Sequence, residues 1–206
     1  ERQRDEWQQA IVSNSEYMTG MVGNVLDMAA IESGRLSLRL EQIDVAAWLA
    51  NVKSLVGDRA SRKGLELEVI ADGNAPKVWI SDRSKLNEIV MNLLTNAIKY
   101  TLNGGVTLHI EQVVDKTAPL LVLRVTDTGI GIAKDLLDQV YEPFTRVHDE
   151  QQFAAVEGAG LGLSVVKTFV DALQGQITLT STLGVGTTVE VQIPMVDEGL
   201  ASAQTS

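Results

Sequence analysis

The sequence predicts an α+β fold, a two-layer α/β sandwich in which helices cover one face of a mixed sheet, preceded by a long N-terminal helix. Three observations favour it. Helical and strand-like segments follow one another without the strict alternation that an all-parallel sheet requires. The chain has 206 residues, 45% of them hydrophobic, which suffices for one well-cored domain and an appendage. The first segment carries an apolar seam of helical spacing that is separate from this pattern.

The N-terminal helix is expected over residues 7–31, before the helix-stopping Gly34. Its apolar positions alternate steps of four and three, as in a coiled-coil seam. The helix could pack on its own domain or form half of a helical hairpin or dimer bundle. We favour the bundle, because the next segment is a separate α/β pattern. We expect three parts: the partial hairpin at residues 1–35, the main domain at 36–196 and a disordered tail at 197–206.

In the main domain, alternating apolar and polar residues predict the strands, and a 3.6-residue apolar period predicts the helices. Asp44 suits the N-cap of the first of these helices. Turns at residues 115–116 and 184–186 each join two strands, and residues 142–157 form a long loop. Helices are expected at residues 45–62, 84–100 and 161–173, and strands at 36–40, 65–70, 77–80, 106–114, 120–126, 176–181 and 187–193.

The composition excludes several classes of protein. A formal net charge of −10 argues against a nucleic-acid surface, which needs clustered Lys and Arg. Without cysteine, the chain can hold neither disulfides nor cysteine-ligated metals. No apolar run approaches the roughly 20 residues of a membrane span, and no signal peptide is visible. From these two absences we expect a cytoplasmic location without direct membrane contact. The chain does not begin with Met, so we also expect it to be a piece of a longer protein.

The helix at residues 84–100 carries two asparagines one turn apart. Asn92 and Asn96 lie on the polar side of this helix with Lys99, opposite the apolar side. An ordinary solvated face is the alternative interpretation. Asn is a poor helix former, however, and its amide oxygen suits Mg²⁺. Lys99 is positioned to meet a phosphate, and Tyr100 offers a ring to a base.

Asp127 ends an apolar strand and is followed by Gly129 and Gly131. A buried carboxylate there costs several kcal/mol unless it accepts hydrogen bonds. The exocyclic amine of adenine is a donor, whereas guanine has an acceptor at that position, so one carboxylate can select adenine. The glycines allow a tight turn and a close approach to a flat ring. A plain Asp-Thr-Gly turn is the alternative.

Gly158, Gly160 and Gly162 open the apolar helix at residues 161–173. Their spacing matches neither the dinucleotide-binding pattern nor the P-loop. A glycine-rich turn at a helix N-terminus still presents free N–H groups to phosphate. In the preceding loop, Phe144 could anchor a lid and Arg146 could reach phosphate, or both could be structural. Neither His109 nor His148 has the partners of a zinc site or a triad. In this order and spacing, the motifs predict one ATP–Mg²⁺ site.

Five motifs of the main domain resemble the motif set of sensor histidine kinases, in the family's order. Residues 92–101 resemble their N box, and residues 127–132 their first glycine box. Residues 142–146 resemble the F box, residues 158–163 the second glycine box, and residues 184–188 the terminal glycine segment. The resemblance covers residues 36–195, and gyrase, heat-shock chaperone and mismatch-repair ATPases share the fold it implies. Residues 24–36 are similar to the second helix of the family's dimerisation and phosphoacceptor domain.

The resemblance implies the ligands ATP and Mg²⁺ and a protein histidine kinase activity. Asn96 is expected to coordinate Mg²⁺, with Asn92 and Lys99 at the phosphates, and Asp127 is expected to accept from the adenine amine. The other nucleotide-binding residues that it implies are Tyr100, Gly129, Gly131, Arg146, Gly158, Gly160, Leu161, Gly162 and Thr187. The related ATPases carry a general-base Glu where this chain has Asn92, which favours a kinase.

The family's H box, which carries the phosphoacceptor, is absent, since no His precedes residue 109. We therefore expect the acceptor His to lie elsewhere in the same kinase dimer, for relay to an Asp of a response regulator receiver domain. The parent is expected to be a membrane-anchored sensor. A non-catalytic module that acts by docking other proteins, and a gyrase-type ATPase, are the alternatives.

Overall fold

The computed structural model describes residue 23 and residues 37–115, 118–145 and 160–195. It divides the chain into two compact units, Glu1–Ser37 and Leu38–Ser206. In the first unit Gly23 is helical, and the rest of the predicted N-terminal helix lies outside the described residues. The predicted tail also lies outside them.

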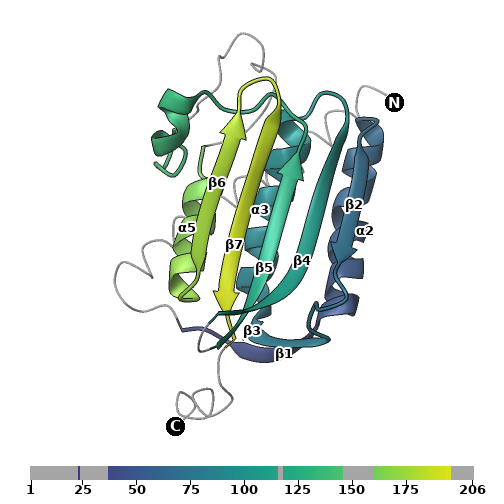
Figure 1. The fold of residues 1–206 in the computed structure, drawn as a ribbon, viewed down its shortest axis with the longest axis vertical. Coiled ribbons are helices and arrows are strands. Elements are labelled where there is room, and N and C mark those ends of the chain that lie inside the picture. The colour runs from purple at the N-terminus through teal and green to yellow at the C-terminus, as the bar shows by residue number, and fades with distance from the viewer. Residues whose placement is uncertain (1–22, 24–36, 116–117, 146–159, 196–206) are drawn as a thin grey trace, which may run out of the picture. The chain divides into compact units, whose positions relative to one another are not determined.

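The second unit is built on a five-stranded mixed sheet in the order β2-β4-β5-β7-β6. Strand β2 runs parallel to β4, and the other neighbours are antiparallel. Among the described helices, α2, α3 and α5 lie behind the sheet in Figure 1 and cover one face. This confirms the predicted fold class. The strands are Glu66–Ala71 (β2), Gly105–Asp115 (β4), Ala118–Asp127 (β5), Gln176–Thr182 (β6) and Gly186–Pro194 (β7), and the helices are Val45–Arg62 (α2), Arg83–Tyr100 (α3) and Gly162–Ala172 (α5).

The core lies between the sheet and these helices. Leu108 of β4 and Leu123 of β5 are fully buried on the sheet side, and Leu86 and Leu94 of α3 are fully buried on the helix side. Because side chains alternate along a strand, one face of each strand supplies this core and the other face the polar surface. Burial of the apolar stripe of α3 therefore turns the opposite stripe, which carries the asparagines, away from the core.

Both ends of α3 are capped by side chains. Asp82 accepts from the backbone N–H of Lys85 at 3.0 Å, as an N-cap does. At the other end, Lys63 Nζ donates to the carbonyl oxygens of Ile98, Lys99 and Thr101, at 2.7, 2.9 and 3.1 Å. These are carbonyls that a helix C-terminus leaves unsatisfied. The last turn, which carries Lys99 and Tyr100, is thus held by a residue that follows α2.

The strand predicted at residues 36–40 is wrong in its position. The structure has β1 at Leu40–Asp44, antiparallel to β3 at Val78–Asp82, in a two-stranded sheet separate from the large one. Alternation occurs in residues 36–40 as well, but pairing of Ile43 with Trp79, both fully buried, fixes the strand further along the chain. A 3₁₀ helix at Lys134–Gln139 (η1) was also not predicted.

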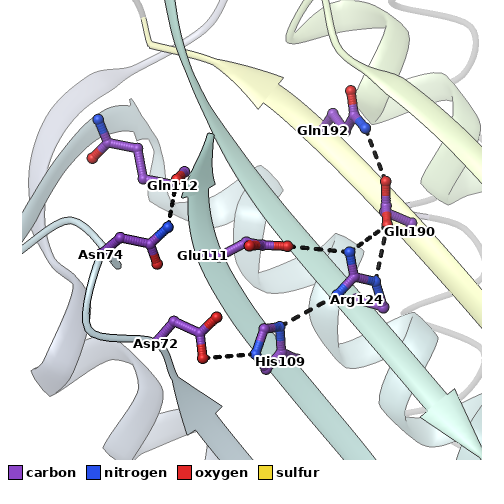
Figure 2. Close-up of polar contacts among 8 residues, drawn as sticks. All are labelled: Asp72, Asn74, His109, Glu111, Gln112, Arg124, Glu190 and Gln192. Carbon is purple, nitrogen blue, oxygen red and sulfur yellow. Dashed lines mark hydrogen bonds and ion pairs between the residues drawn. The ribbon is translucent and has the colours of Figure 1, made fainter. Parts of the chain in front are cut away.

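The outer face of the sheet carries an ionic network around Arg124 (Figure 2). Arg124 pairs with Glu111 of β4 at 3.1 Å and with Glu190 of β7 at 2.8 Å. Its Nη1 lies 3.5 Å from His109 Nδ1, and His109 Nε2 lies 2.9 Å from Asp72 Oδ1. Both ring nitrogens of His109 are therefore engaged, and this histidine contributes to the contacts that join neighbouring strands.

Candidate functional site

The two asparagines of α3 face the glycine-rich start of α5. A Cβ added to Gly162 would lie 2.9 Å from Asn96 Nδ2 and 3.4 Å from Asn92 Oδ1. Only a residue without a side chain leaves this space open at the N-terminal end of α5. The structure therefore brings Asn92, Asn96 and Gly162 together.

The amides of these asparagines suit a hard cation. Asn92 Nδ2 donates to the Glu88 carbonyl oxygen at 2.8 Å, which leaves Asn92 Oδ1 directed away from that bond. Within the part of the chain that the structure describes, the Asn96 amide has no hydrogen-bond partner. Mg²⁺ binds oxygen ligands and keeps several waters, so one or two amide oxygens beside a phosphate fit it. The space over Gly162 and the chemistry of these oxygens thus agree with the predicted metal site.

The C-terminal end of α3 brings Lys99 and Tyr100 to the loop that follows β5. Lys99 Nζ lies 4.8 Å from the centroid of the Tyr100 ring. The Tyr100 carbonyl oxygen accepts from Ile130 N at 3.2 Å, and a Cβ on Gly129 would lie 2.5 Å from that oxygen. A side chain at Gly129 would therefore push the loop away from α3. This contact joins the asparagine half of the predicted site to the Asp127 half.

Asp127 ends β5 and is held through one of its carboxylate oxygens. Asp127 Oδ1 accepts from Gly129 N at 2.8 Å and from Thr187 N at 3.3 Å. Among the described residues, nothing donates to Oδ2. Burial raises the pKa of Asp127 above its ordinary value of 3.8, and the hydrogen bonds from Gly129 and Thr187 act against this. The carboxylate is thus oriented, partly desolvated and left with one oxygen for a donor.

Thr187 lies in the same row as Asp127, and the row extends to a residue that the sequence analysis missed. Asp127 pairs with Thr187 across β5 and β7, and Thr187 pairs with Ser181 across β7 and β6. The Ser181 and Thr187 hydroxyl oxygens are 2.8 Å apart. The sequence does contain a signal for Ser181. Residues 177, 179 and 181 share the half-buried face of β6, and Ser181 is polar where Ile177 and Leu179 are apolar.

The predicted lid region is described only in part. Phe144 N donates to the Gly160 carbonyl oxygen at 3.0 Å, so the F-box segment and the second glycine segment are in contact. Gly160 has φ +71°, a conformation that favours glycine. Leu161 is buried, so its side chain serves packing, and only its backbone could contact a ligand. Arg146 and Gly158 lie outside the described residues.

A hollow of about 660 Å³ lies over α2 and β2 and is lined by residues such as Lys53, Gly57 and Leu67. None of the predicted site residues lines it. The described residues of the predicted site belong instead to the C-terminal half of α3, the end of β5 and the loop after it, the start of α5 and the two residues before it, and the start of β7.

This arrangement of motifs agrees with a family match. The model of the family described as "Histidine kinase-, DNA gyrase B-, and HSP90-like ATPase" matches residues 81–197. The chain belongs to this ATPase family. Its predicted site residues lie within the matched segment, and membership of the family implies ATP binding.

Several relatives of this ATPase domain are named sensor or histidine kinases. The chain is 34% identical over 187 residues to "Autoinducer 2 sensor kinase/phosphatase LuxQ" of Vibrio harveyi, over 89% of this chain and 22% of that protein. It is 35% identical to "Non-motile and phage-resistance protein" of Caulobacter vibrioides, over 92% of this chain and 22% of that protein. The chain thus spans about a fifth of the length of these curated relatives.

Solved structures of histidine kinases share the fold of this ATPase domain. Full-length ShkA, in complex with AMPPNP, gives a TM-score of 0.74 at 28% identity, over 87% of this chain and 36% of that one. The Acinetobacter baumannii histidine kinase AdeS gives a TM-score of 0.71 at 24% identity, over 92% of this chain and 84% of that one. Within the described part of the chain, no helix is both long enough and apolar enough to cross a membrane.

Proposed function

We propose that this chain is the catalytic, ATP–Mg²⁺-binding domain of a two-component sensor histidine kinase. In this function it transfers the γ-phosphoryl group of ATP to a histidine outside this sequence. The observation that carries the proposal is the pair Asn92 and Asn96 facing Gly162, on the same helix whose end contacts the loop after Asp127. One helix thereby links a cation and phosphate end to a base-reading end.

The residues of the chain have distinct parts in this proposal. Asn96 holds Mg²⁺ with support from Asn92, and Mg²⁺ supplies neutralisation of phosphate charge. Lys99 contacts phosphate oxygens, and the backbone N–H groups before and at Gly162 receive the phosphates. Asp127 accepts from the adenine amine. Phosphoryl transfer depends mainly on positioning and charge neutralisation, so no covalent intermediate on this domain is needed.

A kinase fits this helix better than a hydrolase does. The related ATPases require a carboxylate as general base one turn before the metal-binding asparagine, and this chain has Asn92 there. Asn92 cannot take a proton from water, and its Nδ2 is already bound to the Glu88 carbonyl oxygen. The site can therefore position ATP while leaving hydrolysis slow, as a phosphoryl donor requires.

The partners follow from the same proposal. The acceptor is a histidine on a helix of the same kinase dimer, because both histidines of this chain lie after residue 108 and His109 is engaged in the outer-face network. The phosphoryl group then passes to the Asp of a response regulator receiver domain. We propose a cytoplasmic location for this domain, as part of a membrane-anchored sensor, with residues 1–35 as the second helix of the dimerisation hairpin.

Titration calorimetry with ADP in the presence and absence of Mg²⁺ tests the nucleotide site. Wild type should bind ADP more tightly with Mg²⁺, and Asn96→Ala should lose this gain. Asn51→Ala is the matched control, because Asn51 is an exposed asparagine on α2. Absence of ADP binding by folded wild type would overturn the proposal.

The reaction is tested with γ-labelled ATP. The domain alone should release phosphate slowly, and in the dimeric kinase that carries the acceptor helix the label should appear on histidine. Sustained phosphate release by the domain alone would point to a gyrase-type ATPase. Bound ATP without phosphohistidine in the dimer would point to a non-catalytic docking module.

A further inference from the structure

Three residues form a straight row across three strands at one end of the sheet. Asp127 of β5, Thr187 of β7 and Ser181 of β6 lie directly opposite one another in register. Resting on the proposed function, we propose that Ser181 is a positioning residue for base selection. It fixes the direction of the Thr187 hydroxyl so that only acceptors face the base.

The hydroxyl of Ser181 has three polar neighbours, Ile132 N, the Gly186 carbonyl oxygen and Thr187 Oγ1. Ser181 Oγ accepts from Ile132 N at 2.8 Å and donates to the Gly186 carbonyl oxygen at 2.9 Å. A serine hydroxyl has one proton and two lone pairs, so one lone pair remains. Thr187 Oγ1 lies 2.8 Å away. Because the Ser181 proton is already donated, Thr187 must be the donor in this contact.

This direction determines what Thr187 and Asp127 offer to a ligand. With its proton given to Ser181, Thr187 Oγ1 presents only lone pairs elsewhere. Asp127 Oδ1 is occupied by the N–H groups of Gly129 and Thr187, and the ionised Oδ2 is also an acceptor. Two acceptors favour an exocyclic amine, as in adenine, and repel a carbonyl oxygen, as in guanine.

Ser181 also connects two loops of the site. Its bond to Ile132 N joins β6 to the loop that carries Gly131, and Gly184 N donates to the Ile130 carbonyl oxygen at 2.7 Å. Loss of the Ser181 hydroxyl would leave Ile132 N–H without this partner, which reduces stability. A test of positioning must therefore measure base selectivity, which a loss of stability alone does not change.

The test measures the affinities of ADP and GDP by calorimetry for wild type, Ser181→Ala, Thr187→Val and the double variant. We expect Ser181→Ala to reduce the ADP-to-GDP affinity ratio roughly tenfold, the scale of one hydrogen bond. Because Ser181 acts through Thr187, it should cause no further reduction in the Thr187→Val background. Thr178→Ala, on the exposed face of the same strand, should keep the wild-type ratio.

Several outcomes would overturn the inference. The first is an equal loss of ADP and GDP affinity in Ser181→Ala, which would make Ser181 merely structural. The second is an additive effect in the double variant. If Ser181→Ala does not fold, Ser181→Thr replaces it, and a folded Ser181→Thr that loses the ratio contradicts the inference because it keeps the hydroxyl. Failure of wild type to prefer ADP would instead overturn the proposed adenine site itself.

Discussion

Asp127→Asn separates two consequences of the carboxylate that are joined in the wild type. Asp127 Oδ1 accepts two backbone N–H groups, at 2.8 and 3.3 Å. In the variant, the amide oxygen must occupy this position, because an NH₂ group cannot accept them. The NH₂ group then takes the position of Oδ2 and faces the adenine amine, donor against donor. Guanine, with a carbonyl oxygen at that position, meets a matching donor.

The expected magnitude follows from the loss of a hydrogen bond to a charged acceptor, about 1.5–3 kcal/mol. This corresponds to roughly a 10- to 150-fold weaker binding of ADP, while GDP binding should stay equal or improve. Without ligand, the variant should be more stable than wild type at neutral pH, because burial penalises the ionised Asp127. In Asp127→Asn, the affinity for ADP should therefore fall while the free energy of unfolding of the unliganded protein rises.

The pH dependence has a definite sign. A raised pKa means that the folded protein favours protonated Asp127, so the wild type is penalised once this group ionises. The stability gain of Asp127→Asn should therefore be largest above the folded pKa. It should shrink as the pH falls through that pKa and vanish below 3.8, where Asp127 is protonated in both folded and unfolded wild type.

Calorimetry with ADP and GDP, together with thermal unfolding at neutral pH and near pH 4, measures these effects. Asp138→Asn is the control, because Asp138 is an exposed carboxylate on η1. The reasoning is refuted if Asp127→Asn binds ADP as tightly as wild type. It is also refuted if the variant loses stability at neutral pH and binds both nucleotides more weakly by the same factor, which would indicate collapse of the loop.

Four further predictions concern other parts of the domain. Gly162→Ala should displace the Asn96 amide, whose Nδ2 would lie 2.9 Å from the new Cβ, and should abolish the Mg²⁺-dependent gain in ADP affinity by calorimetry. Gly57→Ala, in the interior of α2 with open space around it, should leave binding unchanged and raise stability by about 0.5–1 kcal/mol. Lys63→Ala should lower the free energy of unfolding by about 1 kcal/mol and weaken nucleotide binding, because three carbonyls at the end of α3 lose their donor. Arg124→Met should destabilise the domain by about 1–2 kcal/mol in denaturant titrations without affecting ADP binding. Its glutamate partner on β7 has a pKa held below 4.5, mainly by Gln192 and then by Arg124, so the difference from wild type should shrink as the pH falls below that value.

The sequence determined features that depend on neighbours within a few residues. Helix α2 has the predicted bounds, because the cap at Asp44, whose side chain accepts from Ala47 N at 2.8 Å, is a local signal. The placement of Asn92 and Asn96 on one face of α3 follows from the helical repeat alone. The end of the apolar strand at Asp127 was predicted for the same kind of reason.

Only the tertiary structure decided how distant segments meet. The sequence contains no measure of register, so it could not pair Asp127 with Thr187, sixty residues apart, or add Ser181 to their row. It placed a strand too early at residues 36–40, because alternation there is equally good and pairing with Trp79 selects the later segment. Local spacing fixes which side chains share a face. Which carboxylate oxygen is occupied, and in which direction a hydroxyl proton points, depends on donors brought from other strands.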